Sequence, residues 1–266
     1  MDYLSPDAFF DLTSFAHRDV FAGNKYVWDV LNKISGYLEQ HLKPNVGVLK
    51  CFRRPLPKTV VLWQGQIMDN GFEIIGGDVA KGKFIVKIGS EETSEAAVLC
   101  EGAVLWDEAI FIGPGAVIEP GALVKGPTII GAQTEVRQGA YIRGKCLVGA
   151  GCIVGHTTEM KSSIMLDRAK AGHFAYIGDS VVGHEANLGA GTKLANLKIR
   201  EQTIRVMAHG MRIVTNLRKF GAILGDRVET GCNSVTNPGT VLGKGCQVFP
   251  LISVRAGYYE PDSVIR

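Results

Sequence analysis

A histidine, two cations and a carboxylate between residues 143 and 176 are the candidates for chemistry in this sequence. His173 carries an imidazole, which titrates near neutral pH and can take a proton from an attacking amine or hydroxyl. Arg143 and Lys161 suit a phosphate, the guanidinium through its fork of donors and the ammonium as a point charge. Glu159 could orient and polarise His173, and Tyr176 follows the histidine by three residues.

Each of these side chains also has a plainer interpretation. His173 could form a single hydrogen bond at a turn, and the two cations could belong to a solvated charged face. Glu159 could be an exposed carboxylate with no role. The residue types alone leave these alternatives open, so the choice depends on the elements that position the side chains.

The sequence around these residues repeats with a period of six. An alternating strand has a period of two and a helix a period of 3.6, so a period of six predicts a parallel β-helix of hexapeptide repeats with three short strands in each coil. The residue four places after each aliphatic one is small in eight of ten cases, as a tight corner requires. Residues eighteen apart, such as Arg143 and Lys161, should then stack on one face. The ten aliphatic residues are Ile112, Ile118, Val124, Ile130, Val136, Ile142, Val148, Val154, Met160 and Leu166.

The repeat is interrupted in its second half. We expect the period to slip after Leu166 and to stop after Asn196, and the spacing of six resumes at Leu224. Residues 199–215 resemble a hairpin arm, which a repeat fold tolerates because each coil mostly contacts its neighbours. The sequence therefore predicts a β-helix domain over residues 106–266 that carries this arm.

The first hundred residues lack the repeat. Residues 1–49 are predicted to be helical, with a second helix that begins near Asn24 and an apolar stripe from Val27 to Leu38. Residues 50–105 hold strand-like runs separated by glycines, which predicts a degenerate β region or opening coils. We expect the helical region to cap the scaffold or to pack against a neighbouring subunit.

Composition excludes several classes of protein. The formal net charge of the 266 residues is only +3, which gives no indication of a nucleic-acid or membrane partner. The chain opens without a signal peptide, and no apolar run reaches the length of a membrane span. The six cysteines include no C-x-x-C pair, so we expect reduced thiols, no structural zinc and a cytoplasmic protein.

Three ordered motifs resemble a known family. Residues 156–161, 170–179 and 187–192 resemble the acetyltransferase domain of the bifunctional glucosamine-1-phosphate acetyltransferase/N-acetylglucosamine-1-phosphate uridylyltransferase. Asn196-Leu197, the arm and residues 218–226 are more similar to archaeal-type sugar-1-phosphate nucleotidyltransferases with the same C-terminal β-helix. The resemblance covers about residues 105–255, and it implies a left-handed β-helix and a homotrimer.

The resemblance also implies a reaction and a role for each matched position. It implies an N-acetyltransferase that moves the acetyl group of acetyl-CoA, its co-substrate, to the amine of an amino-sugar phosphate without a metal. His173 would be the general base, with Glu159 beside it. Ala190, through its backbone, and Asn196 would lie near the acetyl group. The positions that would hold the sugar phosphate or line the acceptor pocket are Arg143, Lys161, Tyr176, Asn187 and Lys219.

The sequence departs from the family in three places. Leu197 stands where the bacterial enzymes carry a tyrosine, and residues 1–105 are too few for the nucleotidyltransferase domain. The bacterial tail that helps to hold coenzyme A has no clear match. Two alternatives therefore stay open: a non-catalytic scaffold or regulatory subunit, and an acyltransferase for another sugar or nucleotide-sugar amine. Zinc carbonic anhydrases share the hexapeptide β-helix, but they need two histidines five residues apart, and no pair of the six histidines has that spacing.

Overall fold

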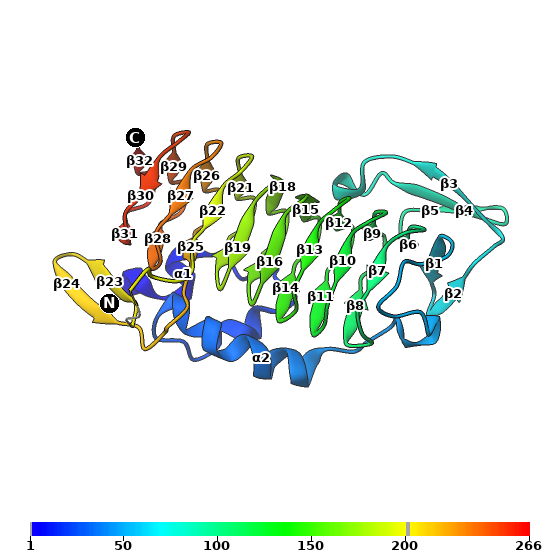
Figure 1. The fold of residues 1–266 in the computed structure, drawn as a ribbon, viewed down its shortest axis with the longest axis horizontal. Helices are drawn as coiled ribbons and strands as arrows, with labels where there is room; N and C mark the ends of the chain where they lie inside the picture. The colour runs from blue at the N-terminus through cyan, green and yellow to red at the C-terminus, as the bar shows by residue number, and fades with distance from the viewer. Residues whose placement is uncertain (1, 201–202) are drawn as a thin grey trace.

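The structure, a computed structural model, describes residues 2–200 and 203–266. Most of these residues form a left-handed parallel β-helix (Figure 1). Three long sheets form the faces of a triangular prism, and we number them in the order in which each coil visits them. Sheet 1 contains β2 (Gln66–Met68), β1 (Val60–Trp63), β6 (Ala97–Leu99), β9 (Val117–Ile118), β12 (Glu135–Val136), β15 (Ile153–His156), β18 (Lys170–His173), β21 (Asn187–Leu188), β26 (Glu229–Thr230), β29 (Gln247–Val248) and β32 (Val264–Ile265).

The other two faces have eight strands each. Sheet 2 contains β7 (Val104–Leu105), β10 (Leu123–Val124), β13 (Tyr141–Ile142), β16 (Glu159–Lys161), β19 (Tyr176–Gly178), β22 (Lys193–Leu194), β27 (Val235–Thr236) and β30 (Ser253–Val254). Sheet 3 contains β8 (Ile110–Ile112), β11 (Thr128–Ile130), β14 (Cys146–Val148), β17 (Ile164–Met165), β20 (Val181–Val182), β25 (Ala222–Leu224), β28 (Thr240–Leu242) and β31 (Gly257–Tyr259). We call the turn from sheet 1 to sheet 2 the first corner and the turn from sheet 2 to sheet 3 the second corner.

Nine of the ten period-six residues fill the prism, and the prediction of its fold is confirmed. All ten aliphatic residues are buried, with at most 2% of their surface exposed. The expected position of the slip is wrong, however. Val148 pairs with Met165, seventeen residues later instead of eighteen, so the coil loses a residue before Leu166. Met165 therefore takes the interior position, and Leu166 packs outside the prism against the N-terminal segment.

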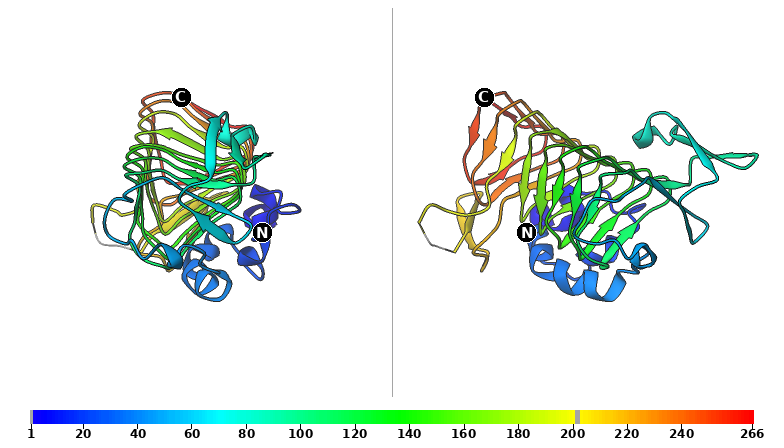
Figure 2. Two further views of the ribbon diagram at one scale, coloured as in Figure 1. Left: turned by 90° about the vertical axis from the view of Figure 1, so that its right-hand side faces the viewer. Right: turned by 45° about the vertical axis from the view of Figure 1, so that its right-hand side comes forward.

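The N-terminal segment covers the outer face of sheet 3 (Figures 1 and 2). It contains α1 (Pro6–Phe9), α2 (Val30–His41) and 3₁₀ turns at Asp2–Leu4, Arg18–Phe21, Val27–Asp29 and Gly47–Leu49. Its apolar side chains, among them Phe9, Trp28 and Leu38, pack in one buried cluster with the outward residues of sheet 3. Helix α2 thus begins at Val30, later than the Asn24 expected from the sequence. Within the described ranges, no helix is long and apolar enough to cross a membrane.

Two antiparallel elements extend from the prism. The arm consists of β23 (Arg205–Ala208) and β24 (Met211–Val214), shown in yellow in Figure 1. Residues 201 and 202, within the predicted arm, lie outside the described residues. Strands β3 (Phe72–Gly76), β4 (Ile85–Ile88) and β5 (Glu91–Thr93), with a 3₁₀ turn at Val79–Lys81, form a small sheet beside the first coils.

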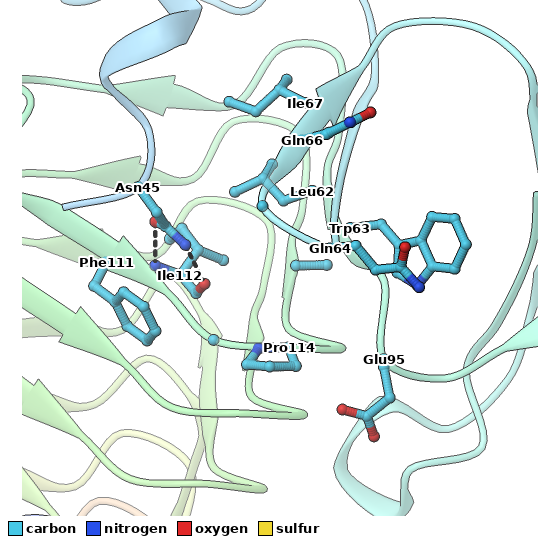
Figure 3. Close-up of a pocket in the computed structure, with 13 residues that line it drawn as sticks. Asn45, Leu62, Trp63, Gln64, Gln66, Ile67, Glu95, Phe111, Ile112 and Pro114 are labelled. Carbon is cyan, nitrogen blue, oxygen red and sulfur yellow. Dashed lines mark hydrogen bonds between the residues drawn. The ribbon is translucent and has the colours of Figure 1, made fainter. Parts of the chain in front are cut away.

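The chain caps the first strand of each face with its own backbone or side chains. Strand β1 pairs antiparallel with β6 of sheet 1. The backbone N–H of Arg53 donates to Leu105 O of β7, at 2.9 Å. At β8, the Asn45 amide donates to Ile112 O at 2.8 Å and accepts from Ile112 N at 2.9 Å (Figure 3). The opening end of all three sheets is therefore hydrogen-bonded to the chain that precedes them.

Candidate active site

A cationic hollow of about 350 Å³ lies at the second corner, between sheets 2 and 3. Successive coils contribute to it because residues at the same place in each coil stack along the prism. The hollow is lined by Gly126, Pro127, Arg143, Gly144, Lys145, Lys161, Ser162, Asp179 and Lys219. It thus brings together three of the positions expected to hold a sugar phosphate.

Two shortened corners form the middle of this hollow. In the coil that contains Arg143, the interior residues Ile142 and Val148, which flank the second corner, are six positions apart. In each of the next two coils the same corner is one residue shorter, and Ser162 and Asp179 occupy these shorter turns. The loss of one residue from each turn leaves space beside the longer neighbouring turns. The slip in the repeat is therefore what shapes the hollow.

The cations of the hollow outnumber its carboxylates. Glu159 Oε1 accepts from Arg143 Nη1 at 2.6 Å, and this hydrogen bond raises the pKa of Arg143. Asp179 Oδ2 accepts from Lys161 Nζ at 2.6 Å, and both side chains are only about 15% exposed. Lys145 and Lys219 have no carboxylate within 4.0 Å among the described residues. Two positive charges thus remain for an anion.

The lysine pair continues into a short polar network on sheet 2. Asn196 donates to the same Asp179 oxygen through its amide, and Tyr176 donates its hydroxyl proton to Asn196 Oδ1 at 3.3 Å. Partial burial raises the pKa of Tyr176, so the phenol stays protonated and remains a donor. Asn196, expected near an acetyl group, therefore lies with the phosphate-binding candidates.

His173 lies at the first corner, on the other edge of sheet 2. It ends β18 and its side chain is exposed, with the ring of Phe174 at 6.2 Å between centroids. Its ring makes no hydrogen bond within the described part of the chain. Glu159, expected to orient it, is bonded to Arg143 instead. His156 is the register partner of His173 on the preceding coil, and its Nδ1 lies 2.9 Å from Gln138 O.

The two remaining predicted residues follow on the next coil. Ala190 lies in the first corner between β21 and β22, and its N–H donates no hydrogen bond to another described residue. Asn187 lies on the exposed face of sheet 1 and borders a hollow of about 220 Å³ with Gln247 and Phe249. Asn187 is thus away from Lys161, whereas Ala190 shares a corner with His173.

The sequence did not single out Lys145 and Asp179. Lys145 has a left-handed backbone, with φ of 53°, directly after Gly144 in the second corner. Its place two residues after Arg143, in the same corner, is the sequence signal that could have indicated Lys145 as a further cation of the site. Asp179 stood inside a motif that was noted for His173, but its partners Lys161 and Asn196 come from other coils.

The rest of the described surface offers weaker sites. A hollow of about 190 Å³ near the opening coils is lined by Asn45, Trp63, Glu95 and Phe111 among others (Figure 3). Its Asn45 amide is already bonded to the backbone of Ile112, which leaves Glu95 as its only charged group. Among the described residues, no three His, Cys, Asp or Glu side chains are grouped so that they could hold a metal ion.

Part of the chain is similar in sequence to several known proteins. The bifunctional sugar-1-phosphate nucleotidylyltransferase/acetyltransferase of Sulfurisphaera tokodaii is 37% identical over 109 residues, 40% of this chain and 27% of that protein. The bifunctional protein GlmU of Methanococcus vannielii is 34% identical over 118 residues (42% and 28%), and that of Methanocaldococcus jannaschii 37% over 95 residues (36% and 23%). The chain thus spans about a quarter of the length of these relatives.

A family model extends the similarity to more than half of the chain. The model of the GMPPB C-terminal domain matches residues 124–265, which include the hollow, His173, the arm and the last coils. The resemblance predicted from the three motifs is confirmed, and the chain belongs to the GMPPB C-terminal domain family of β-helices.

Proposed function

We propose that the chain transfers an acetyl group from acetyl-CoA to the amine of an amino-sugar phosphate. The observation that carries this proposal is the cationic hollow, where Lys145 and Lys219 are left without carboxylate partners in the described structure beside the paired Arg143 and Lys161. A phosphate monoester carries up to two negative charges and three acceptor oxygens, which matches this surplus. The relatives named as sugar-1-phosphate nucleotidylyltransferase/acetyltransferase support the same substrate class.

His173 is the general base of this proposal. The amine nitrogen attacks the thioester carbon, and the imidazole takes the proton that the nitrogen loses as the new C–N bond forms. The C–S bond then breaks and coenzyme A leaves as the thiolate, which takes up a proton. Ala190, which shares the first corner with His173, has an N–H without an acceptor among the described residues, and this group can stabilise the negative charge on the carbonyl oxygen.

The hollow beside Asn187 fits the remainder of the co-substrate. Acetyl-CoA supplies the acetyl thioester, and its long pantetheine chain needs an extended surface with both apolar and polar groups. Phe249 is 44% exposed there, and Asn187 and Gln247 offer amide groups on strands β21 and β29 of sheet 1, which flank β26. These residues would hold the pantetheine chain near His173, which ends the strand before β21.

A second copy of the chain would complete the site. His173 and the cationic hollow lie on opposite edges of sheet 2, so one chain does not bring the base and the cations into one pocket. Sheet 3 is covered by the N-terminal segment, which leaves sheets 1 and 2 for contact with other copies. We therefore propose a homotrimer with sites between neighbouring subunits. All six cysteines are free thiols, which supports a cytoplasmic setting.

A thiol-release assay tests this proposal. Purified protein, acetyl-CoA and glucosamine-1-phosphate or related amino sugars should release coenzyme A. His173→Ala should lower kcat by about 10²- to 10⁴-fold, the usual contribution of a general base. His156→Ala is the matched control, because it removes a corner histidine one coil away and should leave kcat unchanged. No coenzyme A release with any amine, together with no binding of acetyl-CoA, would favour a non-catalytic scaffold.

A further inference from the structure

One residue per coil forms a row along the second corner. Trp106, Lys125, Arg143 and Lys161 follow the inward residues of β7, β10, β13 and β16, which are neighbours in sheet 2. The backbone hydrogen bonds from Trp106 N to Val124 O and from Lys125 N to Ile142 O, both 2.8 Å, fix this stacking. We call these four residues the edge row. It leads from the cationic hollow towards the opening end of the prism.

Aromatic rings lie beside the cations of the edge row. Lys125 Nζ lies 4.4 Å from the ring centroid of Trp106 and 5.3 Å from that of Tyr141. The Arg143 guanidinium lies 5.9 Å from the Tyr141 ring, and that of Arg53 lies 5.7 Å from Trp106. The indole of Trp106 is nevertheless 36% exposed. The row therefore presents an apolar ring at its far end and positive charge before it.

The charges of the edge row extend beyond what a single phosphate needs. Arg143 and Lys161 each have a carboxylate partner, whereas Lys125 and Arg53 have none within 4.0 Å in the described part of the chain. Lys125 is only partly exposed, so water screens it less than a fully solvated lysine. A ligand with one phosphate in the hollow and a second phosphate one coil away would gain further attraction from Lys125.

The spacing of the row suits a nucleotide. Neighbouring strands lie about 4.8 Å apart, so Lys125 is one such step from Arg143 and Trp106 is about 10 Å away. A second phosphate would reach Lys125, and a ribose with its base would span the remaining distance to the indole. Aromatic rings beside cationic grooves are the surfaces on which nucleobases stack.

We propose that the edge row binds the nucleoside diphosphate part of a nucleotide-linked amino sugar. The phosphate next to the sugar occupies the hollow, the second phosphate contacts Lys125, and the base packs on Trp106. This inference rests on the proposed function for the sugar amine, and it specifies the acceptor as nucleotide-linked instead of a sugar monophosphate.

Calorimetry on the full chain tests the inference without acetyl-CoA. Uridine, thymidine, guanosine and adenosine diphosphates are titrated separately, with inorganic pyrophosphate as the probe that lacks a base. At least one nucleotide should bind ten or more times more tightly than pyrophosphate. Trp106→Ala should weaken that nucleotide by about 5- to 150-fold, the range of base stacking, and leave pyrophosphate unchanged. Lys125→Gln should weaken both.

Matched variants separate stacking from damage to the fold. Trp63→Ala removes a partly exposed tryptophan near the opening coils and should leave every affinity unchanged. Trp106→Phe keeps an aromatic face and should retain most of the nucleotide affinity. If Trp106→Ala does not fold, tryptophan fluorescence provides a second test. The nucleotide should quench the fluorescence of the wild type saturably, and this quenching should be lost in Trp106→Phe, which lacks the indole that the base contacts.

Two results would overturn the inference. One is that pyrophosphate binds as tightly as every nucleotide, and the other is that Trp106→Ala folds and binds the nucleotide as the wild type does. Nucleotide binding without any acetyl transfer would support the edge row as a nucleotide site and refute the proposed function. Acetylation of a sugar monophosphate without nucleotide binding would support the proposed function and refute the nucleotide site.

Discussion

Replacement of Glu159 by glutamine tests which residue its carboxylate serves. The sequence placed Glu159 beside His173, whereas Glu159 Oε1 accepts a 2.6 Å hydrogen bond from Arg143 Nη1 in the structure. A carboxylate that assists the base should affect kcat. A carboxylate that occupies a phosphate-binding guanidinium should affect the KM for the acceptor, because the phosphate must compete with it.

The structure sets the size of the expected effect. The side chains of Arg143 and Glu159 are 42% and 35% exposed, so the pair is screened by water and contributes about 0.5–1 kcal/mol. Glu159→Gln keeps the shape of the side chain and removes the competing charge. The KM for the phosphate acceptor should therefore fall by about two- to fivefold, with kcat within about twofold of the wild type.

Steady-state thiol release at fixed pH and saturating acetyl-CoA measures both constants. The matched control is Glu135→Gln, because Glu135 forms a similar 2.8 Å pair with Arg137 on sheet 1, away from the hollow. The control should leave both constants unchanged. A tenfold or larger fall in kcat for Glu159→Gln at unchanged KM would refute this reasoning and assign the carboxylate to His173.

Three further outcomes follow from burial and charge. Lys145→Gln should raise the KM for the acceptor by about fivefold, equivalent to about 1 kcal/mol for a surface cation, with kcat unchanged in the same assay. Met165→Ala should destabilise the fold by about 2–5 kcal/mol in denaturant titrations because it empties an interior position, whereas Leu251→Ala, at a side chain 77% exposed, should change it by less than about 0.5 kcal/mol. A thiol reagent at pH 8 should modify exposed Cys232 and spare Cys146, whose pKa burial raises to about 12. Because burial raises the pKa of Cys146, the free energy of unfolding should fall as the pH rises from about 9 towards 12, where only the unfolded chain releases the thiol proton. Rapid modification of Cys146 in the native protein would contradict both the expected protection and this pH dependence.

The fold was predictable because its signal is local and repeated. Each interior residue follows the previous one by six positions, and the aliphatic residues of this series from Ile112 to Met160 are all buried. The slip was misplaced because Met165 and Leu166 are adjacent and both apolar, so the sequence does not distinguish the one that faces inward. The backbone register, which pairs Val148 with Met165, makes that distinction.

The candidate site was predictable in its residue types and less so in its contacts. Stacking of Arg143 and Lys161 followed from their spacing of eighteen, since each comes directly after one of the paired residues Ile142 and Met160 of sheet 2. The partners of Glu159 and Asp179 did not follow, because they depend on which corner each side chain reaches and on a hydrogen bond to Asn196 from a later coil. The N-terminal stripe predicted an apolar face on this segment. It did not predict that the face packs on sheet 3, because the contacting residues of sheet 3 lie about one hundred or more positions later in the sequence.

The capped opening end has a consequence for how the protein behaves at high concentration. A parallel β-helix that ended in bare strands would offer three rows of unpaired N–H and C=O groups, and such edges are templates for end-to-end fibre growth. Here β1, the segment at Arg53 and the side chain of Asn45 occupy those rows. The residues before the first coil thus block direct stacking of another coil at this end, where the short strand β2 is the edge of sheet 1.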